Sequence, residues 1–270
     1  MPALGRVELK MIETWFQRLP LAAVFVLAVA IVLASLSAGY GAGLRRSKRL
    51  GTHDVGPIGS IVGAMLGLLA FLLAFTFGIA ASRFDVRKKL LLDEVNAIGT
   101  AVLRADLLPE PHATASRRLL KRYVDIRVAQ GNQLKDMATA IAESEAVQRE
   151  LWSHATELAK ADLNSPIGAL FVQALNSVID LHTSRVTVAL QYHIPLRIWT
   201  GLLSVAVLTM IAVGYQFGLA RRNNILIPLV LALAFSAVVL LIADLDRAGE
   251  GALRVSQEPL QKLQEALNKR

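Results

Sequence analysis

The sequence VGPIGSIVGAMLGLLAFLLAFTFGIAAS, residues 55–82, is the longest run in this chain without a charged residue. Charge returns on both sides of it, at Asp54 and Arg83. A helix needs about 20 predominantly apolar residues to cross the hydrocarbon core of a bilayer. The run therefore predicts a transmembrane helix over residues 57–82.

Three other uncharged apolar runs meet the same length requirement, at residues 19–44, 198–220 and 223–243. The first of them is too long, and too far from the N-terminus, to be the short apolar core of a cleaved signal peptide. We expect all of them to be retained as transmembrane helices. Together with 57–82, the predicted spans are 20–44, 197–220 and 225–243.

The composition supports this fold class. Hydrophobic residues make up 54% of the 270 residues, charged residues make up 19%, and the mean hydropathy is +0.48. Soluble domains carry about 25% charged residues. The composition excludes a disordered chain and an ordinary soluble enzyme, and it indicates an all-α membrane protein in contact with membrane lipid.

A charged insert, residues 83–195, separates the second and third spans. Its apolar residues recur at steps of three and four, which is the helical period. Pro109 and Pro111 end the helix that continues from the second span. Ser165 followed by Pro166 is typical of a helix start. We therefore predict a helical extramembrane domain between the two pairs of spans.

The two ends of the chain are short. Residues 1–19 mix apolar and charged residues and include Trp15, so they predict either an amphipathic interfacial helix or an extension of the first span. Residues 244–270 predict a polar C-terminal tail with a short helix from Glu258 to Lys269.

The sidedness of residues 83–195 stays open. An even number of spans places both termini and the insert on one side. The density of basic residues in the two short loops favours cytoplasmic loops, whereas total counts favour the reverse. Those loop residues are Arg45, Arg46, Lys48, Arg49, Arg221 and Arg222. We expect a multi-pass protein of the cell (inner) membrane.

Several kinds of chemistry are excluded or unsupported by the sequence. The chain has no cysteine, so thiolate chemistry and disulfides are excluded. No phosphate-binding loop, dinucleotide-binding motif, zinc-protease motif or hydrolase elbow occurs. The spans contain no internal Asp, Glu, Lys, Arg or His, which argues against a pump or secondary transporter. We predict no enzyme, no catalytic residue, no cofactor and no nucleic-acid partner.

Metal binding has little support. The five histidines do not pair at metal-ligand spacing in the sequence; they are His53, His112, His154, His182 and His193. We therefore predict no metal site among them. After the fourth span, Asp244, Asp246 and Glu250 allow two interpretations, a site for a hard cation such as calcium or a capped helix end.

The second span carries a ladder of residues four apart. Gly59, Gly63 and Gly67 form overlapping G-x-x-x-G patterns, and Phe71 and Phe75 continue the same spacing. Such glycines let helix backbones approach closely. Either the glycines form a packing seam inside one subunit and the phenylalanines face lipid or core, or several copies of this helix surround an axis. In the second case Gly63, Gly67, Phe71 and Phe75 line a pore, and the rings form a hydrophobic constriction.

A polar network is predicted in the insert. Glu94 and Asn96 lie on the helix that leaves the second span, and Asn176, Asp180 and Arg185 lie on the helix that enters the third. We hypothesise that these residues form an inter-helix network in which Arg185 pairs with Glu94 or Asp180. The alternative is that each is a solvated surface residue.

The motifs also carry a family resemblance. LGLLAFLLAFTFGIAASRFDVRKKLLLDEVNAIGTAVLRAD at 66–106 and ALNSVIDLHTSR at 174–185 resemble the bacterial bestrophin-like family of unknown function. So do the shorter motifs DLLPEP at 106–111, IPLRIW at 194–199 and VSQEPL at 255–260. The layout is more distantly similar to that of the bestrophin anion channels.

This resemblance implies a homo-oligomer, pentameric in the channels, whose second span lines a pore for small ions. It implies that Phe71 and Phe75 are neck residues, because Arg83 follows Phe75 by eight residues as the family pattern requires. Gly67 departs from that pattern, which has a bulky residue there. The resemblance also implies a cytoplasmic insert. We expect an ion channel, with a non-conducting scaffold or sensor as the alternative.

Overall fold

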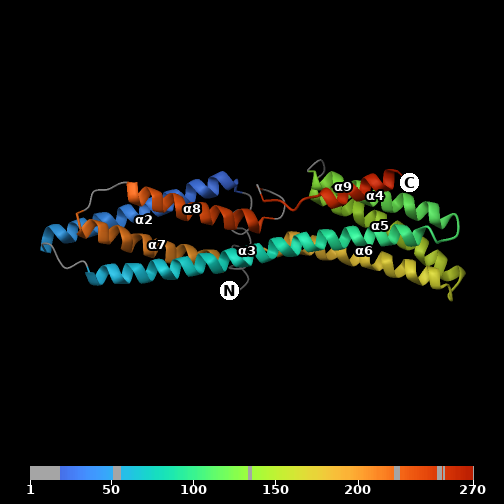
Figure 1. The fold of residues 1–270 in the computed structure, drawn as a ribbon, viewed down its shortest axis with the longest axis horizontal. Helices are drawn as coiled ribbons and strands as arrows, with labels where there is room; N and C mark the ends of the chain where they lie inside the picture. The colour runs from blue at the N-terminus through green and yellow to red at the C-terminus, as the bar shows by residue number, and fades with distance from the viewer. Residues whose placement is uncertain are drawn as a thin grey trace, which may run out of the picture. The chain divides into compact units, whose positions relative to one another are not determined.

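The computed structural model describes residues 19–50, 56–132, 136–221, 226–247, 251 and 253–269. Within these ranges all regular structure is α-helical, which confirms the predicted all-α class. The helices, labelled in Figure 1, are α2 (Leu21–Leu50), α3 (Gly56–Ala105), α4 (His112–Gly131), α5 (Met137–Ala161), α6 (Pro166–Gln191), α7 (Leu196–Leu219), α8 (Leu226–Asp246) and α9 (Glu258–Asn268). The amphipathic segment predicted over 1–19, His53, Arg222 and Glu250 lie outside the described residues, except for Leu19.

The chain divides into two compact units, each with its own apolar core. The membrane unit contains the residues up to Phe84 and those from His193 to Leu253. The extramembrane unit contains Asp85–Tyr192 and the residues from Arg254 onward. α3 is a continuous helix of 50 residues that contributes to both units.

Among the described residues, four helices are long and apolar enough to cross a membrane, as predicted. α2 continues beyond the predicted end at residue 44, through a basic stretch to Leu50. Basic residues in the last turn of a helix interact favourably with its dipole, which accounts for this extension. Ser47 on that stretch accepts a hydrogen bond from Arg221, with Nε 3.1 Å from the Ser47 hydroxyl oxygen.

α2 and α7 form a glycine-to-glycine interface that the sequence analysis did not identify. A Cβ atom added at Gly39 or Gly43 would overlap the backbone oxygen of Ile211 or Tyr215 on α7. Reciprocally, a Cβ at Gly214 or Gly218 would overlap a backbone oxygen of α2. Only glycine permits backbones to approach this closely, so these four residues form the packing seam of the membrane unit.

The acidic residues at the end of α8 bind the backbone of their own unit. Both carboxylate oxygens of Asp246 accept from the Ile194 N–H, at 2.9 and 3.1 Å, and Arg83 lies 3.6 Å away. Asp244 Oδ2 accepts from the Leu253 N–H at 3.2 Å. These two carboxylates therefore satisfy backbone N–H groups within the membrane unit.

The extramembrane unit packs α4, α5, α6, α9 and the second half of α3 around one core. Its largest fully buried side chains include Tyr123, Phe171 and Leu151. α6 begins where predicted, because the Ser165 hydroxyl accepts from the Gly168 N–H and proline occupies the first turn. α9 is not a free polar tail, since Leu260 is fully buried in this core.

Candidate functional site

The ladder on α3 lies from Gly63 to Phe75 on the face of the helix that the protomer leaves uncovered, whereas a Cβ atom added at Gly59 would lie 3.0 Å from Gln216 Nε2 on α7. Residues on the packed face recur about one or two turns apart; they are Val62, Leu69, Thr76 and Ala80. The helical period places the ladder on the opposite side. Phe71 is 66% exposed and Phe75 is 59% exposed. A Cβ atom added at Gly63 or Gly67 would meet nothing within 4 Å.

The described part of the protomer contains no packing partner for two of the ladder glycines. Gly63 and Gly67 form no packing seam with another helix of the same subunit, because nothing lies against them. Only 11% of the apolar window of α3 is buried, compared with 28–33% in the other three spans. α3 is the span with the largest surface left for lipid, for water or for other copies of the chain.

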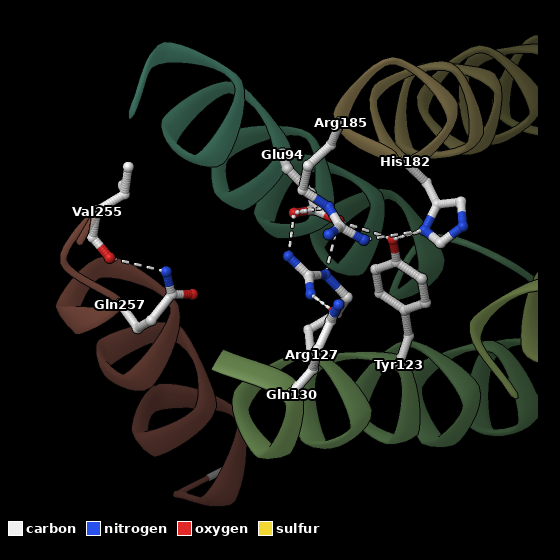
Figure 2. A network of polar contacts seen from close by, with 8 residues as sticks. All are labelled: Glu94, Tyr123, Arg127, Gln130, His182, Arg185, Val255 and Gln257. Carbon is white, nitrogen blue, oxygen red and sulfur yellow. Dashed lines mark hydrogen bonds and ion pairs between the residues drawn. The ribbon is translucent and has the colours of Figure 1, made fainter. Parts of the chain in front are cut away.

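A second site is a buried ionic cluster in the extramembrane unit. Glu94 on α3 is fully buried, and Arg127 on α4 binds it with two parallel contacts of 3.1 Å, from Nε to Oε1 and from a terminal nitrogen to Oε2. The Tyr123 hydroxyl donates to Glu94 Oε1 at 2.8 Å. Arg185 on α6 lies with its Nε 3.2 Å from Glu94 Oε2. Figure 2 shows side chains from three helices converging on this carboxylate.

Charge balance keeps Glu94 ionised. Burial by itself would raise the pKa of Glu94, but the guanidinium groups of Arg185 and Arg127 outweigh burial and lower the pKa to about 2. Burial, followed by the Glu94 charge, raises the pKa of Tyr123 above its ordinary value, so the phenol stays a neutral donor. Two guanidinium groups thus share one carboxylate inside the unit, where a paired charge is tolerated and an unpaired one is costly.

His182 on α6 completes the cluster. Its Nδ1 lies 3.1 Å from the Tyr123 hydroxyl and 3.4 Å from a terminal nitrogen of Arg185. Burial, and next the positive charge of Arg185, lower the pKa of His182 to about 4, against the opposing effect of Glu94. The imidazole is therefore neutral near pH 7.

The predicted network residues are brought together only in part. Arg185 lies against Glu94, one of the two partners considered for it. Asn96, Asn176 and Asp180 are exposed and lie outside the cluster, which corrects that part of the hypothesis. The reason is helical geometry, because each is two residues from a buried position on its helix (Glu94, Val178 and His182), and two residues correspond to about 200° of rotation.

Three members of the cluster were not predicted from the sequence: Tyr123, Arg127 and His182. Tyr123 and Arg127 are four residues apart on α4, and His182 and Arg185 are three apart on α6. Each pair therefore shares one helix face. In the sequence, the signal for the cluster was a pair of polar residues three or four apart on a helix face that is otherwise apolar.

The histidine prediction was also incomplete. His112 and His154 are 42 residues apart in the sequence, yet their Nδ1 atoms lie 3.3 Å apart where α4 and α5 pack. Glu157 Oε2 lies 4.0 Å from each of these nitrogens. Sequence spacing cannot reveal a pair that only tertiary packing creates.

These features define a four-span, all-helical membrane protein with a helical unit inserted between the second and third spans. The family model for the bestrophin-like domain matches residues 23–260, so the chain belongs to the bestrophin-like family. The resemblance drawn from the sequence motifs is thereby confirmed.

Solved structures share the fold at low sequence identity. A crystal structure of a bacterial bestrophin homologue from Klebsiella pneumoniae carrying one mutation is 15% identical, with a TM-score of 0.63 over 91% of this chain and 97% of that one. Another crystal structure of the Klebsiella pneumoniae homologue, phased with zinc, is 17% identical, with a TM-score of 0.60 over 91% and 95%. No curated protein sequence matches this chain significantly. At such identities the likeness shows the fold alone.

Proposed function

We propose that this protein is a homo-oligomeric ion channel of the cell (inner) membrane, with α3 from each copy surrounding a central pore. Gly63, Gly67, Phe71 and Phe75 line that pore. The family membership favours small ions, and anions are the class that the resemblance to bestrophin channels implies. A pentamer is the assembly that the same resemblance implies.

The observation that carries this proposal is the bare face of α3. An apolar face on a transmembrane helix can contact lipid, but this one belongs to the least covered of the four spans and has glycines at the spacing that allows close helix approach. The α2–α7 seam shows what glycines do when they pack inside the protomer. Gly63 and Gly67 have no such partner there, so we assign them to contacts around the pore axis.

Phe71 and Phe75 supply the gate in this proposal. A ring of phenylalanine side chains makes a narrow apolar constriction, from which water withdraws because it cannot hydrogen-bond to the wall. An ion would then have to shed water to pass, which closes the pore. Gly67 leaves a wider section on one side of the constriction. A movement that separates the rings would admit water and ions.

The test is ion flux from liposomes containing the purified protein. Replacing both Phe71 and Phe75 by alanine should raise the flux, because the constriction loses its bulk. The matched control is Leu208→Ala, which removes an exposed apolar side chain from α7 (58% exposed). Unchanged flux in the double variant, in a preparation whose wild type conducts, would contradict the assigned gate. A protein that never conducts would instead favour a scaffold or sensor whose helical unit binds a partner or ligand.

A further inference from the structure

A cluster of metal-binding side chains lies in the extramembrane unit, separate from both sites described above. His112 is the first residue of α4, and His154 and Glu157 lie three residues apart on α5. Residues at this spacing project from the same helix face. The imidazole rings of His112 and His154 meet edge to face, with centroids 5.4 Å apart and an interplanar angle of 74°.

The distances fit a tetrahedral metal site. Two nitrogens bound to one Zn²⁺ at about 2.0–2.1 Å lie roughly 3.3–3.4 Å apart when the geometry is tetrahedral. His112 Nδ1 and His154 Nδ1 are 3.3 Å apart. Glu157 Oε2 lies 4.0 Å from each nitrogen, and its side chain is 61% exposed, so a small rotation would complete the third ligand position.

We propose that His112, His154 and Glu157 bind a divalent transition-metal ion of the zinc class that links α4 to α5. Imidazole and carboxylate donors suit Zn²⁺, whereas Mg²⁺ and Ca²⁺ prefer oxygen ligands alone. The two histidine side chains are 19% and 23% exposed, so an ion can reach them and a water molecule can fill the fourth position. The competing explanation for the 3.3 Å contact is a hydrogen bond between two imidazoles with no metal.

The ion has a direct structural consequence. It would tie the start of α4 to the last third of α5, which are otherwise held by apolar packing. Because the three ligands come together only in the folded unit, an ion that binds there stabilises the folded state in proportion to its concentration above the Kd. The site therefore predicts that the stability of the unit depends on the free metal concentration.

The experiment uses the full-length protein in detergent, freed of metal with a chelator and titrated with Co²⁺ and then with Zn²⁺. The chain has no cysteine, so thiolates cannot compete for the ion. We expect one equivalent of Co²⁺, with the intense visible absorption of tetrahedral coordination, and its displacement by Zn²⁺. We also expect Zn²⁺ to raise the melting temperature.

Variants locate the site. His112→Ala and His154→Ala should each weaken binding by at least about tenfold, because three protein ligands are needed to hold the ion. Glu157→Gln should weaken it less. His193→Gln and Glu150→Gln are matched controls that should bind as the wild type does. The Zn²⁺-dependent rise in melting temperature should disappear in the two histidine variants, whose circular dichroism reports whether they fold.

Two results would overturn this proposal. One is the absence of Co²⁺ or Zn²⁺ binding in a folded wild type, which would leave the histidine pair as a hydrogen bond. The other is wild-type affinity in folded His112→Ala and His154→Ala variants, which would place the ion elsewhere.

Discussion

The two halves of α3 differ in how much of their surface the protomer covers. In the extramembrane half one face of the helix packs into the core of its unit, and its buried residues are Leu91, Glu94, Ile98, Ala101, Val102 and Ala105. In the membrane half, which is longer, only Val62, Leu69, Thr76 and Ala80 are buried. The protomer thus covers one half of the helix more fully than the other.

Because of this difference, residues in the two halves of α3 contribute to different properties of the protein. A residue in the extramembrane half contributes to the stability of a single chain, because its neighbours belong to that chain. A residue on the bare face of the membrane half contributes little to that stability. In the proposed channel it contributes to assembly and conduction instead. Substitutions in the two halves should therefore have different consequences.

The largest loss of stability is expected at Glu94. Glu94→Gln leaves Arg127 and Arg185 buried without their shared carboxylate, and breaking a buried ion pair costs about 3–5 kcal/mol. The neighbouring Asp93 is the control, since its pair with Lys89 is exposed. Asp93→Asn should cost at most about 1 kcal/mol, as is usual for surface pairs. Denaturant unfolding of the detergent-solubilised protein measures both, and equal losses would contradict the central role given to Glu94.

Two glycine-to-alanine substitutions in the membrane unit should change its stability in opposite directions. Gly214→Ala places a methyl group against the α2 backbone, so the seam must open, at a cost of about 3 kcal/mol. Gly67→Ala meets nothing in the protomer, and alanine favours a helix over glycine by up to about 1 kcal/mol. The melting temperature of the dissociated protomer should fall for Gly214→Ala and stay level or rise for Gly67→Ala. A fall in both would show that α3 is packed within the protomer.

A smaller, pH-dependent loss is expected from His182. Its pKa is lowered in the folded state from the ordinary value of 6.5 to about 4, so the unfolded chain binds the proton more tightly. The stability contributed by His182 is therefore complete above pH 6.5 and falls as the pH drops toward 4, by about 3.4 kcal/mol at most. His182→Gln should flatten the profile between pH 6.5 and 4. The further loss from Glu94, between its ordinary value of 4.5 and about 2, should remain. An unchanged profile in His182→Gln would assign the acid sensitivity to other groups.

Local patterns predicted the elements well. The four spans follow from uncharged runs, and the start of α6 follows from Ser165 and Pro166, because each depends on residues adjacent in the chain. The α2–α7 seam also had a local signal in Gly39, Gly43, Gly214 and Gly218, but their pairing depends on which helices pack together. The ionic cluster and the His112–His154 contact join residues tens of positions apart. Such contacts depend on which helices pack together. No fixed spacing between residues in the sequence indicates which of them will meet.

The most direct test of the pore assignment is cross-linking through a cysteine placed on α3. The chain contains no native thiol, so Phe75→Cys introduces a single reactive site. Treatment of membranes with a short bifunctional thiol reagent should join copies through Phe75→Cys, because in the proposed channel this face of every copy surrounds a common axis. Leu208→Cys on α7, similarly exposed in the protomer, should remain unlinked. If the Phe75→Cys variant stays monomeric after treatment, or if both variants cross-link equally, the pore assignment is contradicted.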